Sequence, residues 1–303
     1  MYDIIIIGGG PAGLCAAIYA RRANKSVLIL EKNAFGGQIT FSPKVENYPG
    51  FESVSGSELA DKLVSHVLAQ GADVEVETVT AIRTENGIKT VETEDGNTYE
   101  ARAVIIANGA RHRHLGLENE ERFIGDGISF CAVCDGAFYK NKTVALVGGG
   151  NSALQEAILL CENCKKVYVI QNLDFLTGEK RLQEILAKRN NVEIIMGTVV
   201  KEIADTPEFS AITVERTIDG VQTTLELDGL FVAIGLVPEN GAFEGVADLD
   251  ANGYFAADEN CTTKTSGIFV AGDCRQKSVR QVATATADGA VAAIAACRYI
   301  DAL

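Results

Sequence analysis

Two glycine-rich turns, each between a predicted strand and a predicted helix, constrain the fold of this chain more than any other feature. The first turn spans residues 8–13 and follows an apolar run that begins at Tyr2. The second spans residues 148–153 and follows a similar run from Thr143. A strand, a glycine turn and a helix in this order are typical of a Rossmann-like unit with a parallel sheet. The sequence therefore predicts an α/β fold in which this unit occurs twice.

Hairpin patterns follow each unit. Alternating residues at 74–77 and 89–92, punctuated by an Asn-Gly and an Asp-Gly pair at 86–87 and 95–96, predict antiparallel hairpins after the first unit. A second meander is predicted around residues 212–227, where Asp and Gly at 219–220 form the turn. We therefore expect two Rossmann-like dinucleotide-binding domains, each with a parallel sheet and a β-meander insertion.

The domain order follows from the length and from the end of the chain. With 303 residues the chain is long enough for two domains of ordinary size. A short predicted strand at 267–273 and an Ala-rich helical tail follow the second meander. We expect both to return to the first domain, which then comprises residues 1–112 and 242–303. The second domain, residues 113–241, would be inserted into the first.

The first glycine turn has the residues that dinucleotide binding requires. Gly8 allows the tight turn, Gly10 allows close approach to a pyrophosphate, and Gly13 allows the helix to pack on the strand. Glu31 ends the next predicted strand, 18 positions after Gly13, where an acid bonds to ribose hydroxyls. A dinucleotide site is preferred here over a turn that only packs a helix.

The second glycine turn keeps only half of such a site. Gly148, Gly150 and Ala153 preserve the backbone pattern. Gln171 lies 18 positions after Ala153, where an NAD site has a carboxylate and an NADP site has arginines. The second unit is therefore either a scaffold that binds no nucleotide or a nucleotide site with an atypical adenosine pocket.

One pair of cysteines has the spacing of a redox-active dithiol. Cys131 and Cys134 can close a small reversible disulfide, and a thiolate of the pair can attack a partner's disulfide. Asp135 follows directly and can supply or take the proton of that exchange. Cys161 and Cys164 form a second pair, so a four-cysteine zinc site is the alternative. The strand, turn and helix between the pairs favour catalysis by the first pair, a structural second pair and no metal.

Other candidate residues receive structural interpretations. The cysteines at 15, 261, 274 and 297 lie in no motif and are expected to be packing residues. Two arginines and two histidines alternate at 111–114, next to the predicted domain boundary. We interpret this run as a solvated crossover between domains rather than a catalytic cluster.

Composition excludes several functional classes. The formal net charge of -14 disfavours nucleic acid and anionic membranes as partners. No secretory pattern occurs at the N-terminus, and no apolar run is long enough for a membrane span. Eight cysteines in 303 residues are too few for a disulfide scaffold. The expected location is cytoplasmic.

Taken together, these motifs resemble those of the low-molecular-weight thioredoxin reductases along essentially the whole chain. The similar stretches are residues 8–13, 36–38, 45–50, 131–135, 148–153, 232–235, 271–273 and 280–282. The resemblance implies a homodimeric flavoprotein that binds FAD in the first domain and reduces thioredoxin or a thioredoxin-like protein. The second domain, of the pyridine-nucleotide type, would carry the dithiol.

The resemblance also implies the roles of single residues. Cys134 would be the thiol nearest the flavin, Cys131 would attack the partner disulfide, and Asp135 would handle the proton. The FAD-binding residues that it implies are Gly8, Gly10, Pro11, Ala12, Gly13, Glu31, Gly37, Gln38, Asn47, Val79, Ala107, Gly109, Asp273, Arg280, Gln281 and Val282.

Departures from the family pattern bear on the electron donor. NADPH-dependent members have His-Arg-Arg after the second-domain strand and a further Arg, whereas this chain has Gln171-Asn172-Leu173 and Thr177. The usual Ala-Thr-Gly before the linker is Ala-Asn-Gly at 107–109. The chain thus looks like the ferredoxin-dependent flavin thioredoxin reductases, and we expect reduced ferredoxin as donor. An NAD(P)H-dependent reductase and a non-catalytic flavoprotein redox sensor are the alternatives.

Overall fold

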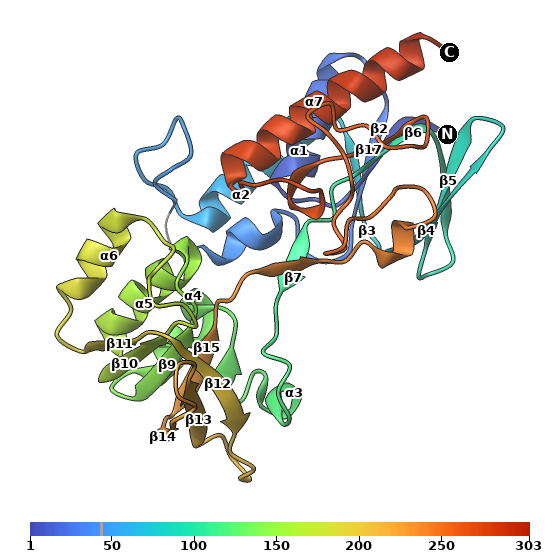
Figure 1. The fold of residues 1–303 in the computed structure, drawn as a ribbon. Coiled ribbons are helices and arrows are strands. Elements are labelled where there is room, and N and C mark those ends of the chain that lie inside the picture. The colour runs from blue at the N-terminus through green and yellow to red at the C-terminus, as the bar shows by residue number, and fades with distance from the viewer. Residues whose placement is uncertain (43–44) are drawn as a thin grey trace. The chain divides into compact units, whose positions relative to one another are not determined.

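The chain forms two compact units (Figure 1). The computed structural model describes residues 1–42 and 45–303, without the side chains of Phe41, Val133 and Cys134. Unit 1 comprises Met1–Arg111 and Val237–Leu303, and unit 2 comprises His112–Leu236. The chain passes between the units through β7 (Ala110–His112) and β16 (Leu236–Pro238), which pair with each other.

The second boundary lies before residue 237, whereas the sequence predicted it after residue 241. The reason is the buried side chain of Asn240, which donates hydrogen bonds to the carbonyl oxygens of Gly253 and Cys274. A buried amide must keep such partners, so residues around 240 are fixed in unit 1.

Unit 1 is built on a sheet with strand order β3-β2-β1-β6-β5-β4, and β17 pairs with β6. Its strands are β1 (Tyr2–Ile7), β2 (Val27–Glu31), β3 (Asp73–Val76), β4 (Val79–Glu85), β5 (Ile88–Thr93), β6 (Thr98–Ile106) and β17 (Ile268–Val270). The strands β1, β2, β3, β6 and β17 pair in parallel, and β4 and β5 continue the sheet as antiparallel strands.

One hairpin expectation is wrong. The sequence predicted residues 74–77 as part of an antiparallel hairpin, but β3 pairs in parallel with β2, with Leu28 opposite Asp73. β3 is the sheet's edge strand and exposes Asp73, Glu75 and Val76 to solvent, so the alternating sequence pattern does not indicate its pairing direction. The expected hairpin turn at Asn86 and Gly87 is confirmed, and both residues have positive φ there.

Helices α1 (Pro11–Arg22), α2 (Gly56–Ala69) and α7 (Val282–Asp301) belong to unit 1. The expected Ala-rich tail is α7, which lies along α1 (Figure 1). A Cβ at Gly289 would lie 2.1 Å from the Ala12 oxygen, so only glycine permits this approach. Short 3-10 helices occur at Gly37–Phe41, Gly241–Phe243 and Gly272–Cys274. None of the helices in the described residues is long and apolar enough to cross a membrane.

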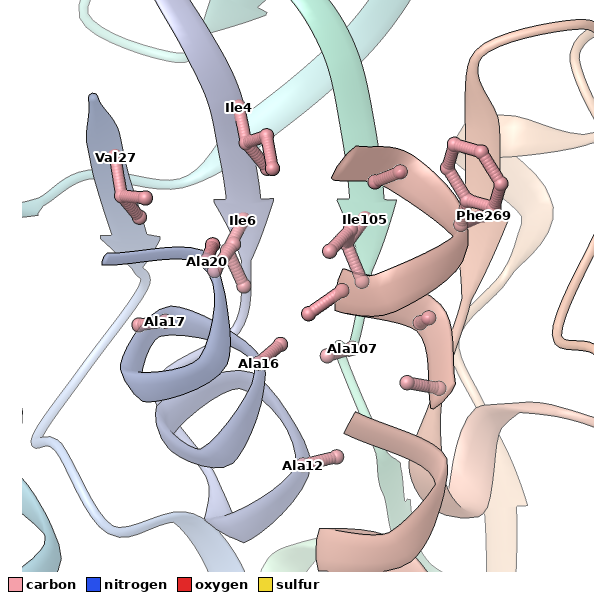
Figure 2. Packing of buried hydrophobic residues seen from close by; sticks show 14 of the residues in the cluster. Ile4, Ile6, Ala12, Ala16, Ala17, Ala20, Val27, Ile105, Ala107 and Phe269 are labelled. Atoms are coloured by element: carbon pink, nitrogen blue, oxygen red, sulfur yellow. The ribbon is translucent and has the colours of Figure 1, made fainter. Parts of the chain in front are cut away.

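The core of unit 1 lies on both faces of the sheet because strand side chains alternate. Ile4 and Ile6 of β1 point to one face, where they pack with the alanines of α1 and with Ile105 and Phe269 (Figure 2). The neighbouring residues 5 and 7 point to the other face and join a separate apolar cluster. The parallel strands β1, β2 and β17 are therefore buried on both sides.

Unit 2 repeats the architecture on a smaller scale. Its parallel sheet has the order β11-β10-β9-β15-β8, and the expected second meander is the separate sheet β12-β13-β14. The strands are β8 (Ile128–Ser129), β9 (Thr143–Val147), β10 (Lys166–Ile170), β11 (Val192–Ile195), β12 (Thr198–Ile203), β13 (Ala211–Arg216), β14 (Gln222–Glu226) and β15 (Gly229–Val232). The helices are α3 (Glu120–Phe123), α4 (Ala132–Asp135), a 3-10 turn at Gly136–Tyr139, α5 (Asn151–Asn163) and α6 (Lys180–Ala187).

Candidate active site

The first glycine turn brings three segments of unit 1 into close contact. Gly8 has a φ of 107°, and a Cβ there would lie 2.3 Å from the carbonyl oxygen of Ala107. A Cβ at Gly13 would lie 1.9 Å from the Gly8 oxygen, so the start of α1 can pack on β1 only with glycine. Gly10 precedes Pro11, the first residue of α1. The free amides of this helix N-terminus suit a phosphate.

Glu31 and Gly37 lie beside the first glycine turn. Glu31, at the end of β2, accepts hydrogen bonds from the amides of Gly9 at 2.6 Å and Asn33 at 3.0 Å. Gly37 has a φ of 60°, and a Cβ there would lie 3.1 Å from Cα of Gly10. The two backbones therefore approach each other closely, and Gln38 follows with an exposed side chain.

Asp273 has the clearest sign of a missing ligand. Its Oδ1 atom is buried and has no hydrogen-bond partner among the described residues. Burial raises the pKa of this carboxyl, although the charges of Lys277 and Arg280 act in the opposite direction. The preceding Gly272 lies against Ala12, with 2.8 Å between a Cβ built there and the alanine Cβ. A ligand hydroxyl beside the glycine turn would satisfy this oxygen.

Other predicted FAD-binding residues gather at the start of α7. Asn47 donates a hydrogen bond to the side chain of Gln281 at 3.0 Å, and Gln281 caps α7, whose first residue is Val282. The guanidinium of Arg280 stacks 4.0 Å from the ring centroid of Tyr254. Asp273 is joined to this group because its carbonyl oxygen accepts from Arg280 Nε at 3.4 Å.

Two predicted residues lie elsewhere in unit 1. Gly109, with a φ of 68°, follows β6, and its backbone bonds to the thiol of Cys274. Val79 begins β4 and packs, half-buried, against the core cluster on the far side of the sheet from α1. The structure records no hydrogen bond that ties Val79 to the other predicted residues in the described chain.

A buried ion-pair cluster that the sequence did not indicate supports this site. Asp288 of α7 accepts from Arg275 at 2.7 and 2.8 Å, from Lys277 at 2.8 Å and from the Gly272 amide at 3.0 Å. Burial alone would raise the pKa of Asp288, but the hydrogen bonds from the two cations lower it. The only sequence signal is an acid within the apolar stripe of α7.

In unit 2 the second glycine turn has the same geometry around a neutral side chain. A Cβ at Gly148 would lie 2.3 Å from the Ala233 oxygen, as at the first turn. The amide of Gln171 is buried under Gly149, with 2.6 Å between its Cδ and a Cβ built there. Gln171 Nε2 donates to the Phe175 oxygen at 3.2 Å. The side chain at the position that would select a nucleotide is thus uncharged and bonded to the loop that follows it.

The predicted dithiol lies on α4 and just before it. Cys131 is disulfide-bonded, whereas the side chain of Cys134 lies outside the described residues. The amide of Asp135 donates to the Cys131 oxygen at 3.1 Å. The hydroxyl of Ser129 donates to Asp135 Oδ2 at 2.6 Å and accepts from the Cys131 amide at 3.0 Å. Ser129 was not predicted, and only its place two residues before the motif could have indicated it.

Glu156 is a second residue that the sequence did not indicate. It projects from α5, and its Oε2 accepts from the Ala132 amide at 3.3 Å. Burial raises the pKa of its carboxyl to about 7, although the Ala132 amide acts in the opposite direction. Its signal in the sequence is an acid beside the buried positions 153, 157 and 160 of α5.

The remaining cysteines are free and outside this site. Cys161 and Cys164 are buried thiols whose pKa values burial raises to about 11. Because Cys131 is in a disulfide, it cannot supply a thiolate to a four-cysteine zinc site. Within the described residues, no group of three or more His, Cys, Asp or Glu side chains could hold a metal ion.

The histidines of the crossover contact the residue before the dithiol. The rings of His112 and His114 stack on Phe130, with centroids 5.7 and 4.8 Å away. Burial, and the neighbouring His114, lower the pKa of His112. The sequence interpretation of a solvated crossover is wrong for His112, because its ring is packed.

A pocket of about 460 Å³ in unit 2 also adjoins Asp135. Apolar side chains, among them Phe138 with 74% of its surface exposed, and the acids Asp126 and Asp228 line it. An exposed phenylalanine in the same pocket as Asp135 is a feature that another protein can contact.

Comparisons with known proteins identify the family. A family model described as pyridine nucleotide-disulphide oxidoreductase matches residues 2–289. The thioredoxin reductase of Listeria innocua is 42% identical over 304 residues, covering 100% of this chain and 95% of that protein. The solved structure of Lactococcus lactis thioredoxin reductase matches with a TM-score of 0.97 at 35% identity, covering 100% of both chains. A ferredoxin-flavin thioredoxin reductase of Clostridium acetobutylicum is 31% identical, with a TM-score of 0.55 and 100% and 99% coverage of the two chains.

The site in unit 1 fits the cofactor of this family. The first glycine turn suits a pyrophosphate, Glu31 suits ribose hydroxyls, and the unpaired oxygen of Asp273 suits a further hydroxyl of FAD. The family and the two-domain fold that the motifs predicted are confirmed, whereas the ferredoxin-dependent subgroup stays a prediction. The chain binds FAD and belongs to the pyridine nucleotide-disulphide oxidoreductase family, among the low-molecular-weight thioredoxin reductases.

Proposed function

We propose that the chain transfers electrons from FAD, through the Cys131 and Cys134 pair, to the disulfide of thioredoxin or a thioredoxin-like protein. The observation that carries the proposal is the disulfide-bonded Cys131, which is linked to Asp135 through the Ser129 hydroxyl by hydrogen bonds of 3.0 and 2.6 Å. Six other cysteines are free, which suits a cytoplasmic location, where thiols are kept reduced. The pocket next to Asp135, with its exposed Phe138, is a suitable contact for the partner protein.

The exchange has three chemical steps. FAD, when bound, supplies the two electrons that convert the enzyme disulfide to a dithiol. The Cys131 thiolate then attacks the partner disulfide to form a mixed disulfide, and Cys134 attacks Cys131 to release the partner as a dithiol. Each released partner sulfur needs a proton, and in this proposal the Asp135 carboxyl would supply it. The enzyme disulfide is restored, so two electrons pass to the partner.

We propose that FAD binds to the residues that the sequence indicated. Most of these residues fall into two groups. The glycine turn, Gly37 and Glu31 would hold the pyrophosphate and the adenosine ribose. Residues at the start of α7 and Asp273 would hold the flavin end, where the helix N-terminus favours negative charge on the reduced ring. Gln38, Asn47, Val79, Ala107 and Gly109 remain predicted contacts.

We also propose that reduced ferredoxin is the electron donor. A nucleotide site of this fold selects its ligand with charge at the position of Gln171, and this side chain is neutral, buried and bonded to Phe175. Losing two or three charge-assisted hydrogen bonds of roughly 1.5–3 kcal/mol each lowers affinity by a factor of about a thousand or more. A ferredoxin near -400 mV can reduce a thioredoxin near -270 mV, which releases roughly 6 kcal/mol for two electrons.

The intact backbone of the second glycine turn favours one other candidate, an NAD(P)H-dependent reductase. Gly148 and Gly150 keep the geometry of a nucleotide site, and the N-terminus of α5 has no side-chain cap. Rapid anaerobic mixing of the FAD-loaded protein with each donor separates the two candidates. We expect loss of flavin absorbance with reduced ferredoxin and not with micromolar NADPH or NADH. The reverse result would exclude ferredoxin as donor.

Two variants separate the donor step from the disulfide step. Cys134→Ser should still lose flavin absorbance with the donor but should not reduce thioredoxin. Cys161→Ser, a change outside the site, should keep both activities. Steady-state reduction of thioredoxin at catalytic protein concentrations also excludes the redox-sensor alternative, since a sensor does not turn over.

The homodimer of the resemblance is a further proposal. Exposed apolar side chains on unit 1, Val291 and Ile294 of α7 and Tyr19 of α1, support it, since a partner subunit could cover them. Light scattering during gel filtration should give twice the chain mass of 32.2 kDa. A species of single-chain mass at micromolar concentration would rule the homodimer out.

A further inference from the structure

Ser129 lies at the centre of the hydrogen bonds around Cys131. It ends β8, and only 4% of its surface is exposed. The Cys131 amide donates to its hydroxyl at 3.0 Å, and the hydroxyl lies 2.6 Å from Asp135 Oδ2. It also lies 3.3 Å from the Cys131 oxygen. A small buried side chain thus contacts both the redox-active cysteine and the acid.

The single proton of the hydroxyl decides the direction of these bonds. A serine hydroxyl can donate once and accept twice. The carboxylate is the closer and stronger acceptor, so the proton goes to Asp135 rather than to the Cys131 oxygen. That oxygen is already satisfied, because it accepts from the Asp135 amide at 3.1 Å.

The result is a closed ring of three residues. The Cys131 amide bonds to Ser129, Ser129 bonds to the Asp135 carboxylate, and the Asp135 amide bonds back to the Cys131 carbonyl. The Cys131 amide is therefore linked through Ser129 to the Asp135 side chain, and the Cys131 carbonyl is bonded to the Asp135 amide. Without the hydroxyl, the carboxylate loses its shortest side-chain partner and is free to change rotamer.

We propose that Ser129 is a positioning residue for disulfide exchange, which aims the Asp135 carboxyl at the sulfur that leaves when the Cys131 disulfide opens. The inference rests on the proposed function of the dithiol. In the step concerned, the attacking thiol gives its proton to the Asp135 carboxylate and forms a bond to one sulfur of the disulfide, the S–S bond breaks, and the departing sulfur takes that proton from Asp135. Ser129 itself exchanges neither electrons nor protons with the substrate.

A positioning role differs measurably from a role in packing or docking. Ser129 is buried, so it does not contact the partner protein, and KM for thioredoxin should not change. Ser129→Ala should lower kcat about 10- to 100-fold, the share of general acid catalysis that depends on orientation. Ser129→Thr, which restores the hydroxyl, should recover most of the rate. Thr198→Val removes a hydroxyl of equal burial in β12 and is the matched control, with unchanged kcat.

A double-mutant cycle tests whether Ser129 acts through Asp135. Ser129→Ala added to Asp135→Asn should cost no further rate, because the group that it positions is already lost. Additive losses would overturn the proposal, as would a Ser129→Ala variant with unchanged kcat or a loss confined to KM. If the alanine variant does not fold with FAD, Ser129→Cys keeps the volume while weakening the hydrogen bond and should show the same loss.

A second readout does not require thioredoxin or an electron donor. Dithiothreitol reduces the enzyme disulfide directly, and its rate in the FAD-loaded protein should fall about 10-fold in Ser129→Ala and no further in the double variant. If the wild type reduces no thioredoxin but shows this pattern, the proposed function fails and the role of Ser129 stands. If thioredoxin is reduced and this pattern is absent, the proposed role of Ser129 fails and the proposed function stands.

Discussion

Glu31 and Gln171 occupy equivalent places beside the two glycine turns, but only Glu31 can carry a charge. Glu31 accepts from the Gly9 amide at 2.6 Å, and Gln171 is packed under Gly149 and bonded to Phe175. The same fold therefore places an acidic side chain beside the glycine turn of unit 1 and a neutral one beside that of unit 2.

Glu31→Gln should weaken FAD binding. The change keeps the shape but removes the charged acceptor for ribose hydroxyls, worth roughly 1.5–3 kcal/mol, or about 10- to 150-fold in affinity. Titration of the apoprotein with FAD, followed by flavin fluorescence, measures it. Gln171→Glu is the matched control and should change FAD affinity less than about twofold. Equal losses in the two variants would contradict the assignment of FAD to unit 1.

The glycine turns and the cysteine motif were predictable because each is a contiguous motif with fixed spacing. Gly8 and Gly148 are required by backbone contacts two segments away, yet the requirement appears in the sequence as a short fixed pattern. The partner of Glu156 is 24 residues away, and Asp288 meets Arg275 across 13. No periodic pattern specifies such pairs, since they depend on how separate elements pack. For β3, an exposed edge strand has the same alternation as a hairpin strand, so pairing direction was not determined.

Glu156 should make stability depend on pH near neutrality. Burial raises the pKa of its carboxyl from 4.5 to about 7, so between these values the folded state holds a proton that the unfolded state has lost. The stabilisation is fully present below pH 4.5 and is lost as the pH rises through about 7, with a total near 1–3 kcal/mol. Urea unfolding at pH 5 to 8 measures it.

The matched variants isolate the contribution of this carboxyl. Glu156→Gln still accepts from the Ala132 amide but has no titratable group, so its stability should fall less between pH 5 and 8 than that of the wild type. Glu162→Gln changes an exposed glutamate of the same helix, paired with Arg189, and should follow the wild type. Parallel pH curves for wild type and Glu156→Gln would refute the raised pKa.

Asp288→Asn should destabilise unit 1 strongly. The change removes the carboxylate with which the buried Arg275 and Lys277 are both paired, a loss of about 3–5 kcal/mol. Because the pKa of Asp288 is lowered, its contribution is present above the unfolded value of 3.8 and lost only as the pH falls through the folded pKa. The deficit should therefore be constant between pH 6 and 8. Asp248→Asn breaks an exposed pair with Lys264 and should cost less than about 1 kcal/mol. Similar urea midpoints for the two variants would mean that the buried cluster does not stabilise the fold.

Alkylation of the reduced protein should distinguish the two Cys-x-x-Cys pairs. Burial raises the pKa values of Cys161 and Cys164 to about 11, so at pH 8 roughly one in a thousand of these thiols is ionised. Cys131 is only partly buried, and its amide and carbonyl are held by Ser129 and Asp135. With iodoacetamide and peptide mapping, Cys131 should react at least about 10-fold faster than either residue of the second pair. Reaction of Cys161 or Cys164 at the rate of Cys131 would assign the second pair a redox role and contradict its structural interpretation.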